Sequence, residues 1–226
     1  HPSAPEWEPG GAGLVLHTIL GEGDKLMVAI SAAGVFASED GGETWERRNR
    51  RTNQATTPDP ITGECGKEIG FCVHNISRSA DGRTFYMQNH QGVFRSRDEG
   101  RSWDEISEGL PATFGFPVAA HPVDADTLYV LPLDEWNGRM PLGGKATVWR
   151  STKAGEGWEP MRSGLPDDAY FTVLRQAMAT DKAAKAGIYF GTNSGSVFAS
   201  TDGGESWREI ARHLPTVLGV EVMHRR

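Results

Sequence analysis

The fold of this 226-residue chain is decided by the stretch Ser200-Thr201-Asp202-Gly203-Gly204-Glu205-Ser206-Trp207. The octad Ser-x-Asp-x-Gly-x-x-Trp recurs at 38–45 and 96–103, and a fourth copy at 151–158 has Lys153 in place of the Asp. Such an octad predicts a tight turn: Ser and Asp side chains bond backbone amides, glycine takes a positive φ, and Trp packs beneath. We therefore assign a structural role to Ser38, Asp40, Gly42, Trp45, Ser96, Asp98, Gly100, Trp103, Ser151, Gly155, Trp158, Ser200, Asp202, Gly204 and Trp207.

Short strand-like segments surround each octad and fall into groups of four. The octad always joins the third and fourth segments of a group, and a Leu-Pro pair follows three of the groups, at 110–111, 165–166 and 214–215. Four strands per repeat of roughly 40–50 residues are typical of a β-propeller. We predict an all-β chain forming one propeller domain or fragment over 1–226, with antiparallel blades at about 14–48, 71–110, 116–165 and 171–215, and a closing strand at 217–224.

Composition excludes several classes of function. The formal net charge is −7 and no basic stripe is present, so nucleic acid is not an expected partner. No apolar run approaches the length of a membrane span and no signal peptide is evident, so we expect a soluble chain, cytoplasmic rather than secreted. Cys65 and Cys72 allow either a small disulfide ring or two free thiols.

The octads are those of the Asp-box, or BNR repeat. The chain resembles the BNR/Asp-box propellers, which include sialidases, sortilin-type receptors and photosystem II assembly factors. It is most similar to bacterial WD40/YVTN/BNR-like proteins labelled glycosyl hydrolase or exo-alpha-sialidase. The segments that carry this resemblance are 29–36, 72–74, 88–94 and 174–181. Such relatives have further blades before the equivalent of His1, which implies either absent N-terminal blades or a ring completed by another chain, including a homo-oligomer.

Propeller geometry then predicts a ligand site. The first strand of each blade lines the central channel, and aligning these strands places His17, His74, Ala119, Arg175 and Glu221 at one position. Loops on the face opposite the octads add Asn89, His90, Asp134, Glu135, Trp136, Tyr170 and Asn193. We expect a small polar or carbohydrate-like ligand, or a protein partner, at this channel mouth, bound by His17, His74, Asn89, His90, Glu135, Trp136, Arg175 and Glu221. A purely structural role is the alternative: hydrogen-bonded histidines, an Arg175–Glu221 ion pair, and a tryptophan that fills its own loop.

Two other functions compete with binding. The resemblance implies sialidase-type glycoside hydrolysis, for which Tyr170, Arg175 and Glu221 are the residues that map to catalytic roles, although the second and third arginines of the sialidase triad are not evident. A metal site is the other alternative, with His17, His74 and His90 as ligands together with Glu221. No cofactor is otherwise predicted.

Overall fold

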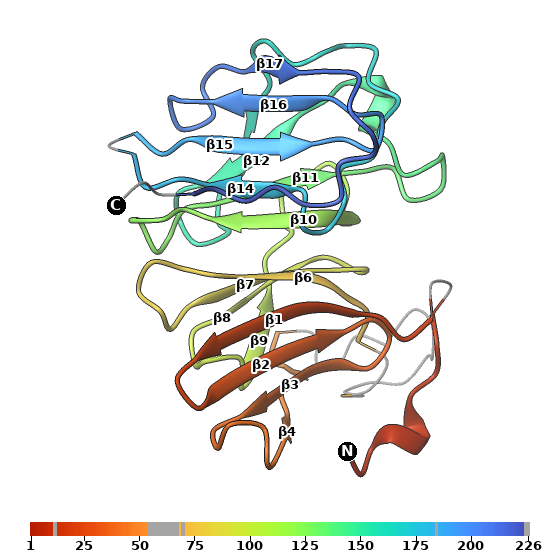
Figure 1. Cartoon of the computed structure of the whole chain (residues 1–226), viewed down its shortest axis with the longest axis vertical. Coiled ribbons are helices and arrows are strands. Elements are labelled where there is room, and N and C mark those ends of the chain that lie inside the picture. The colour runs from red at the N-terminus through yellow and green to blue at the C-terminus, as the bar shows by residue number, and fades with distance from the viewer. Residues whose placement is uncertain (11–12, 54–67, 69–70, 184, 224–226) are drawn as a thin grey trace.

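The computed structural model describes residues 1–10, 13–53, 68, 71–183 and 185–223. Four antiparallel four-stranded sheets follow one another along the long axis of the molecule, from blade 1 at the bottom of Figure 1 to blade 4 at the top. Blade 1 contains β1 (Leu16–Glu22), β2 (Lys25–Ile30), β3 (Gly34–Ser38) and β4 (Glu46–Arg47). Blade 2 contains β6 (Val73–Arg78), β7 (Phe85–Asn89), β8 (Val93–Ser96) and β9 (Ser102–Glu105). The predicted all-β partial propeller is confirmed.

The last two blades have the same order of strands. Blade 3 contains β10 (Gly115–Ala120), β11 (Leu128–Pro132), β12 (Val148–Ser151) and β13 (Glu159–Met161). Blade 4 contains β14 (Met178–Thr180), β15 (Ile188–Gly191), β16 (Val197–Ser200) and β17 (Arg208–Ala211). The remaining elements are β5 (Arg50–Arg51), which pairs in parallel with β9, and the 3-10 turns η1 (Ala4–Glu6) and η2 (Leu142–Gly144). No helix in the described part of the chain has the length and apolar character needed to cross a bilayer.

Blade 4 begins differently from the sequence prediction. The sequence alignment places Arg175 on the inner strand of this blade, but that strand lies at Met178–Thr180, after Arg175. The backbone of Gln176 forms a parallel bridge with Gly219, and the Val220 amide donates to the Gln176 carbonyl at 2.9 Å. The C-terminal segment therefore occupies the pairing positions just before β14. Of the predicted closing strand at 217–224, the described residues form this single bridge rather than a strand.

The hydrophobic core is divided into three parts, one between each pair of consecutive blades. Each part contains the octad tryptophan of the later blade: Trp103, Trp158 or Trp207. The indole Nε1 of Trp103 donates to the Arg48 carbonyl at 2.9 Å, which lies just after β4 in blade 1. Trp158 makes the same bond to Ile106 just after β9 in blade 2. The indole of Trp207 has no hydrogen-bond partner in the described structure, and this octad bonds to blade 3 through the Trp207 backbone amide, which donates to the Ser163 carbonyl at 2.8 Å.

The octad of blade 1 faces no earlier blade. Its Trp45 is half-buried, and the indole donates to the Gly42 carbonyl within its own turn. On the inner strand of the same blade, Leu16 and Ile19 are 48% and 65% exposed. This side of blade 1 is an apolar sheet face that the N-terminal segment covers only in part, where the rings of His1 and Trp7 contact the buried Phe36.

The side chains of Ser38 and Asp40 hold the first octad turn together. Ser38 Oγ donates to Asp40 Oδ1 at 2.7 Å and accepts the Gly42 amide at 2.8 Å, while the Thr44 amide donates to Asp40 Oδ1 at 2.9 Å. The octads at 96–103 and 200–207 repeat this pattern. In the copy without Asp, Ser151 Oγ donates to the Glu156 carbonyl instead and still accepts the Gly155 amide. The turn is retained because serine alone bonds both sides of it.

Acid is expected to weaken these turns. Hydrogen bonds from Ser38 and Thr44 lower the pKa of Asp40 to about 2, and those from Ser206 and Ser200 lower the pKa of Asp202 to about 2. A carboxyl whose pKa is lower in the folded than in the unfolded chain stabilises the fold above its unfolded value, and this stabilisation is lost as the pH falls through the folded value. The stability difference between the wild type and Asp40→Asn/Asp202→Asn should therefore be present at pH 7 and shrink between about pH 4 and pH 2. Thermal melts of both proteins across this range test it, and a constant difference would contradict it.

Candidate functional site

The inner strands of the first three blades each carry a β-bulge near their beginning. His17 lies in the bulge of β1, His74 in that of β6, and Phe116 with Pro117 in that of β10. A bulge turns the side chain of its extra residue away from the regular alternation. The structural equivalent of the two histidines in blade 3 is therefore Phe116–Pro117, whereas Ala119, which the sequence alignment had placed there, pairs regularly with Tyr129 and is buried.

His74 lies at the centre of an aromatic group. Its ring is 4.9 Å from the Phe116 ring and 5.4 Å from those of Phe114 and His90, measured between centroids. The Nδ1–H donates to the Gly115 carbonyl at 2.6 Å. Burial lowers the pKa of His74 to about 3, against that hydrogen bond and with help from Arg175, so this imidazole is neutral at physiological pH.

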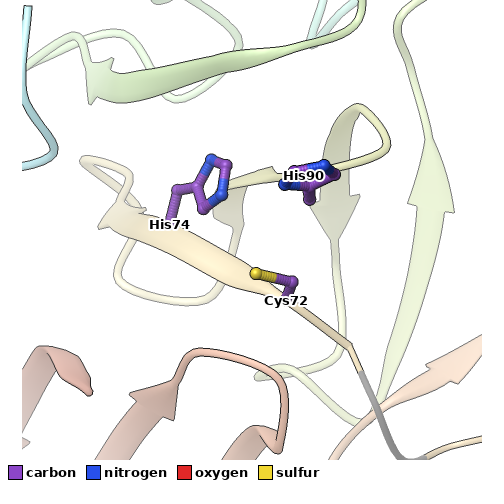
Figure 2. A group of neighbouring side chains, drawn as sticks. All are labelled: Cys72, His74 and His90. Atoms are coloured by element: carbon purple, nitrogen blue, oxygen red, sulfur yellow. The ribbon is translucent and has the colours of Figure 1, made fainter. Parts of the chain in front are cut away.

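His90 and Cys72 lie beside this ring. The His90 amide donates to the Cys72 carbonyl at 2.9 Å, which places the two residues opposite each other across the β6–β7 hairpin. His90 Nε2 is 2.8 Å from Glu135 Oε1, and both side chains are about one-quarter exposed. The Cys72 thiol is free, and burial raises its pKa. Figure 2 shows Cys72 and His74 on one stretch of chain and His90 facing them from the neighbouring strand.

Two arginines bring positive charge to the same place. The Arg175 guanidinium lies over the Phe116 ring, 4.5 Å from its centroid, and Arg139 lies 5.4 Å from the centroid of Phe114. Arg175 is half-buried and its Nε has no hydrogen-bond partner. Burial lowers the pKa of Arg175, and the neighbouring Arg139 acts in the same direction. Within the described residues neither guanidinium forms an ion pair with a carboxylate.

His17 completes the arrangement from blade 1. It is half-buried, and its Nε2 is buried with no hydrogen-bond partner. Burial, with a smaller effect from Arg175, lowers the pKa of His17 to about 4. We define the channel-mouth cluster as the set of side chains described above: His17, Cys72, His74, His90, Phe114, Phe116, Glu135, Arg139 and Arg175. Its members come from all four blades and lie at the end of the sheets opposite the octads.

Beside this cluster, the side chain of Asn75 forms hydrogen bonds that link the inner strand of blade 2 to blades 1 and 4. Its Oδ1 accepts from Thr18 Oγ1 at 3.0 Å and from Gln176 Nε2 at 2.9 Å, and its Nδ2 donates to the Arg175 carbonyl at 2.9 Å. Gln176 Nε2 also donates to the His17 carbonyl at 2.7 Å. Blades 1 and 4, at the two ends of the row, are thereby bonded to each other through blade 2.

Several residues expected at the site lie outside the cluster. Trp136 is 85% exposed and Tyr170 72% exposed. Glu221 is also exposed, and in the described structure it forms no ion pair with Arg175. Among the described residues, no hydrogen bond or ion pair joins Tyr170, Arg175 and Glu221, the candidate catalytic residues, to one another.

The remaining predicted residues shape loops. Asp134 accepts the Trp136 and Asn137 amides, and Asn193 Oδ1 accepts the Thr172 amide at 2.7 Å. Asn89 is fully buried and its Oδ1 accepts the Gln91 amide. Cys65 lies outside the described residues, and so does the disulfide ring that was one of the two alternatives for Cys65 and Cys72.

A second hollow, between blades 1 and 2 at the octad end, is a weaker candidate. It is lined by Leu20, Met27 and Phe85 together with charged side chains that pair with each other, such as Lys25 with Glu99 and Arg78 with Glu22. The charges that line this hollow are already compensated by one another. Arg139 and Arg175 of the channel-mouth cluster, in contrast, form no ion pair among the described residues.

Comparison with known proteins supports the fold without assigning a family. No family model and no curated protein matches the chain. Among solved structures, the GH74 xyloglucanase from Xanthomonas campestris superposes with a TM-score of 0.58 at 20% identity, over 89% of this chain and 31% of that one. YCF48 from Cyanidioschyzon merolae superposes with a TM-score of 0.55 at 18% identity, over 90% of this chain and 58% of that one. The β-propeller domain of Cps50 (Swd1) from Myceliophteria thermophila superposes with a TM-score of 0.60 at 12% identity, over 93% of this chain and 61% of that one. The chain thus spans from about a third to three-fifths of the length of these propellers.

Proposed function

We propose that this chain is a binding propeller of Asp-box type whose channel mouth takes a small polar, carbohydrate-like ligand that carries a negative charge. The observation that carries the proposal is Arg175, a half-buried guanidinium stacked on Phe116 with no carboxylate partner in the described structure. An uncompensated charge at low solvent exposure is costly, and an anionic ligand removes that cost. Arg139 and the unpartnered Nε2 of His17 supply further groups for the same ligand.

Support for the Asp-box type comes from the turns themselves. In three octads the serine Oγ accepts the amide of the glycine four residues later, and the serine also bonds to the octad aspartate. The fourth octad keeps the bond from the glycine amide to the serine Oγ. The blade boundaries at about 14–48, 71–110, 116–165 and 171–215 belong to the same proposal. We also propose that further propeller blades cover the exposed face of blade 1, because Trp45 there carries the indole donor that Trp103 and Trp158 use toward a preceding blade.

The positive charge of Arg175 leads to an expectation about which ligands bind. A sugar acid such as a uronate or a sialic acid should bind more tightly than the neutral sugar of the same size. Arg175→Met keeps an apolar stem over Phe116 and removes the charge, and it should weaken binding of the acid about 10- to 100-fold, the equivalent of one charged hydrogen bond of about 1.5–3 kcal/mol. Isothermal titration calorimetry measures this.

The control is Arg83→Met, which removes an exposed arginine in the turn between β6 and β7, at the octad end. It should leave the affinity unchanged. Equal affinities of wild type and Arg175→Met for the acid would contradict the proposal. Hydrolysis of a glycoside panel by the wild type would favour the alternative, a glycoside hydrolase, for which two carboxylates must flank the scissile bond.

A further inference from the structure

Three potential metal ligands converge within the channel-mouth cluster. Cys72 lies directly before β6 and His74 lies in the bulge of that strand, while the His90 amide bonds to the Cys72 carbonyl across the hairpin. The thiol sulfur and one ring nitrogen of each histidine all lie within 4.8 Å of one another. Among the described residues His17 does not belong to this group, so the set differs from the His17, His74 and His90 set expected from sequence.

The second nitrogen of each ring is already engaged by an oxygen. A carbonyl oxygen can only accept, so His74 donates from Nδ1 to Gly115, and the carboxylate of Glu135 likewise fixes the proton of His90 on Nε2. The lone pairs then remain on Nε2 of His74 and Nδ1 of His90. Histidine ligands of metals are oriented in this way, with the outer N–H bound to a carbonyl or a carboxylate.

We propose that Cys72 Sγ, His74 Nε2 and His90 Nδ1 bind one Zn²⁺ ion. One thiolate and two imidazoles are donors that Zn²⁺ prefers, at about 2.3 Å for sulfur and about 2.0–2.1 Å for nitrogen. Tetrahedral coordination needs the three donor atoms about 3.3–3.8 Å apart. Metal binding would therefore draw the three donor atoms, which lie within 4.8 Å of one another, closer together, and the side chains of Cys72 and His90 are only half-buried.

Charge defines the fourth position of the ion. Binding breaks the S–H bond, forms the S–Zn bond and releases the proton to solvent, so the ion with its three protein ligands carries one net positive charge. Arg175 and Arg139 act electrostatically on Cys72 and add to this charge. The fourth position is therefore suited to an anion such as hydroxide or a carboxylate. The metal proposal itself does not depend on the proposed ligand, because it is tested with metal alone.

Cobalt(II) provides a visible probe for the same donors. Reduced, metal-depleted protein should take up one equivalent of Co²⁺, with a thiolate-to-cobalt charge-transfer band and the intense visible bands of a four-coordinate ion. One equivalent of Zn²⁺ should abolish both. Cys72→Ser should remove the charge-transfer band, and His90→Gln should weaken binding at least tenfold. Glu135→Gln, which acts on His90 alone, should weaken it about 10- to 100-fold.

The controls separate this site from its neighbours. Cys65→Ser removes the only other thiol of the chain and should keep the charge-transfer band. His17→Gln removes a half-buried histidine of the same cluster and should leave the affinity for Co²⁺ unchanged. Circular dichroism and thermal melts confirm that each variant is folded.

Several results would overturn the proposal. These are no cobalt spectrum in folded wild type, a charge-transfer band that survives Cys72→Ser, or a band that is lost in Cys65→Ser. Loss of sugar-acid binding in Arg175→Met with the cobalt spectrum intact would support both proposals separately. A normal cobalt spectrum in a protein that binds no sugar acid would reject the proposed ligand alone.

Discussion

Gly155→Ala is expected to lower the free energy of unfolding by about 3 kcal/mol. Gly155 has a φ of +100°, which side-chain-bearing residues rarely adopt, and this backbone strain costs about 1–2 kcal/mol. A Cβ at this position would also lie 2.3 Å from Ile106 Cδ1 of blade 2, which adds about 1–3 kcal/mol of overpacking. Urea unfolding followed by tryptophan fluorescence measures the sum.

A matched control comes from the first octad. Gly42 occupies the same turn position with a φ of +96°, but its nearest contact for an added Cβ is Leu26 Cδ1 at 3.5 Å, in its own blade. Gly42→Ala should therefore show the backbone strain alone, about 1–2 kcal/mol. The difference between the two variants isolates the contact between blades. Equal losses in both would contradict the packing of the third octad against blade 2.

Asn75→Asp is expected to destabilise the protein by about 3 kcal/mol without creating a cavity. The exchange replaces the amide group that donates to the Arg175 carbonyl with an oxygen that repels it, at a side chain that is only 5% exposed. Each buried polar group left unsatisfied costs about 1–3 kcal/mol, and more when a charge is involved. Denaturant unfolding at pH 7, where the new carboxyl is ionised, tests this.

Thr18→Val serves as the control for this site. It removes the 3.0 Å hydrogen bond from Thr18 to Asn75 and the 3.2 Å hydrogen bond from the Ile76 amide to Thr18 Oγ1, and it conserves the volume of the side chain. The loss of these two bonds should cost about 1–2 kcal/mol. If Asn75→Asp were no more destabilising than Thr18→Val, the bonds from Asn75 to Arg175 and Gln176 would not contribute to stability.

The sequence predicted the repeat and its blades because the octad uses local chemistry. Ser38 and Asp40 bond amides within four residues, so their pattern is visible in the chain itself. It also pointed to His17, His74, His90 and Arg175, since inner strands share a channel. It placed the fourth inner strand too early because the pairing of Gln176 with Gly219 depends on a segment more than 40 residues later.

The rest of the site depends on contacts that no spacing reveals. Arg139 lies in the long loop between β11 and β12, and the sequence does not indicate that this loop brings Arg139 over the Phe114 ring. The bulge in β10, which puts Phe116 at a position where β1 and β6 have a histidine, shifts the register by one residue. Cys72 was detectable: a Cys-x-His strand, followed across a hairpin by a second histidine, places three donors together.

The indole bonds of Trp103 and Trp158 give the row of blades a direction. Each runs from a later blade to a carbonyl of the earlier one, 55 or 52 residues before it. A ribosome makes the earlier blade first, so these two octads emerge with their acceptors already in place and can fold onto a finished template. In a row with such nearest-neighbour coupling, damage in one blade should spread mainly to the blades synthesised after it.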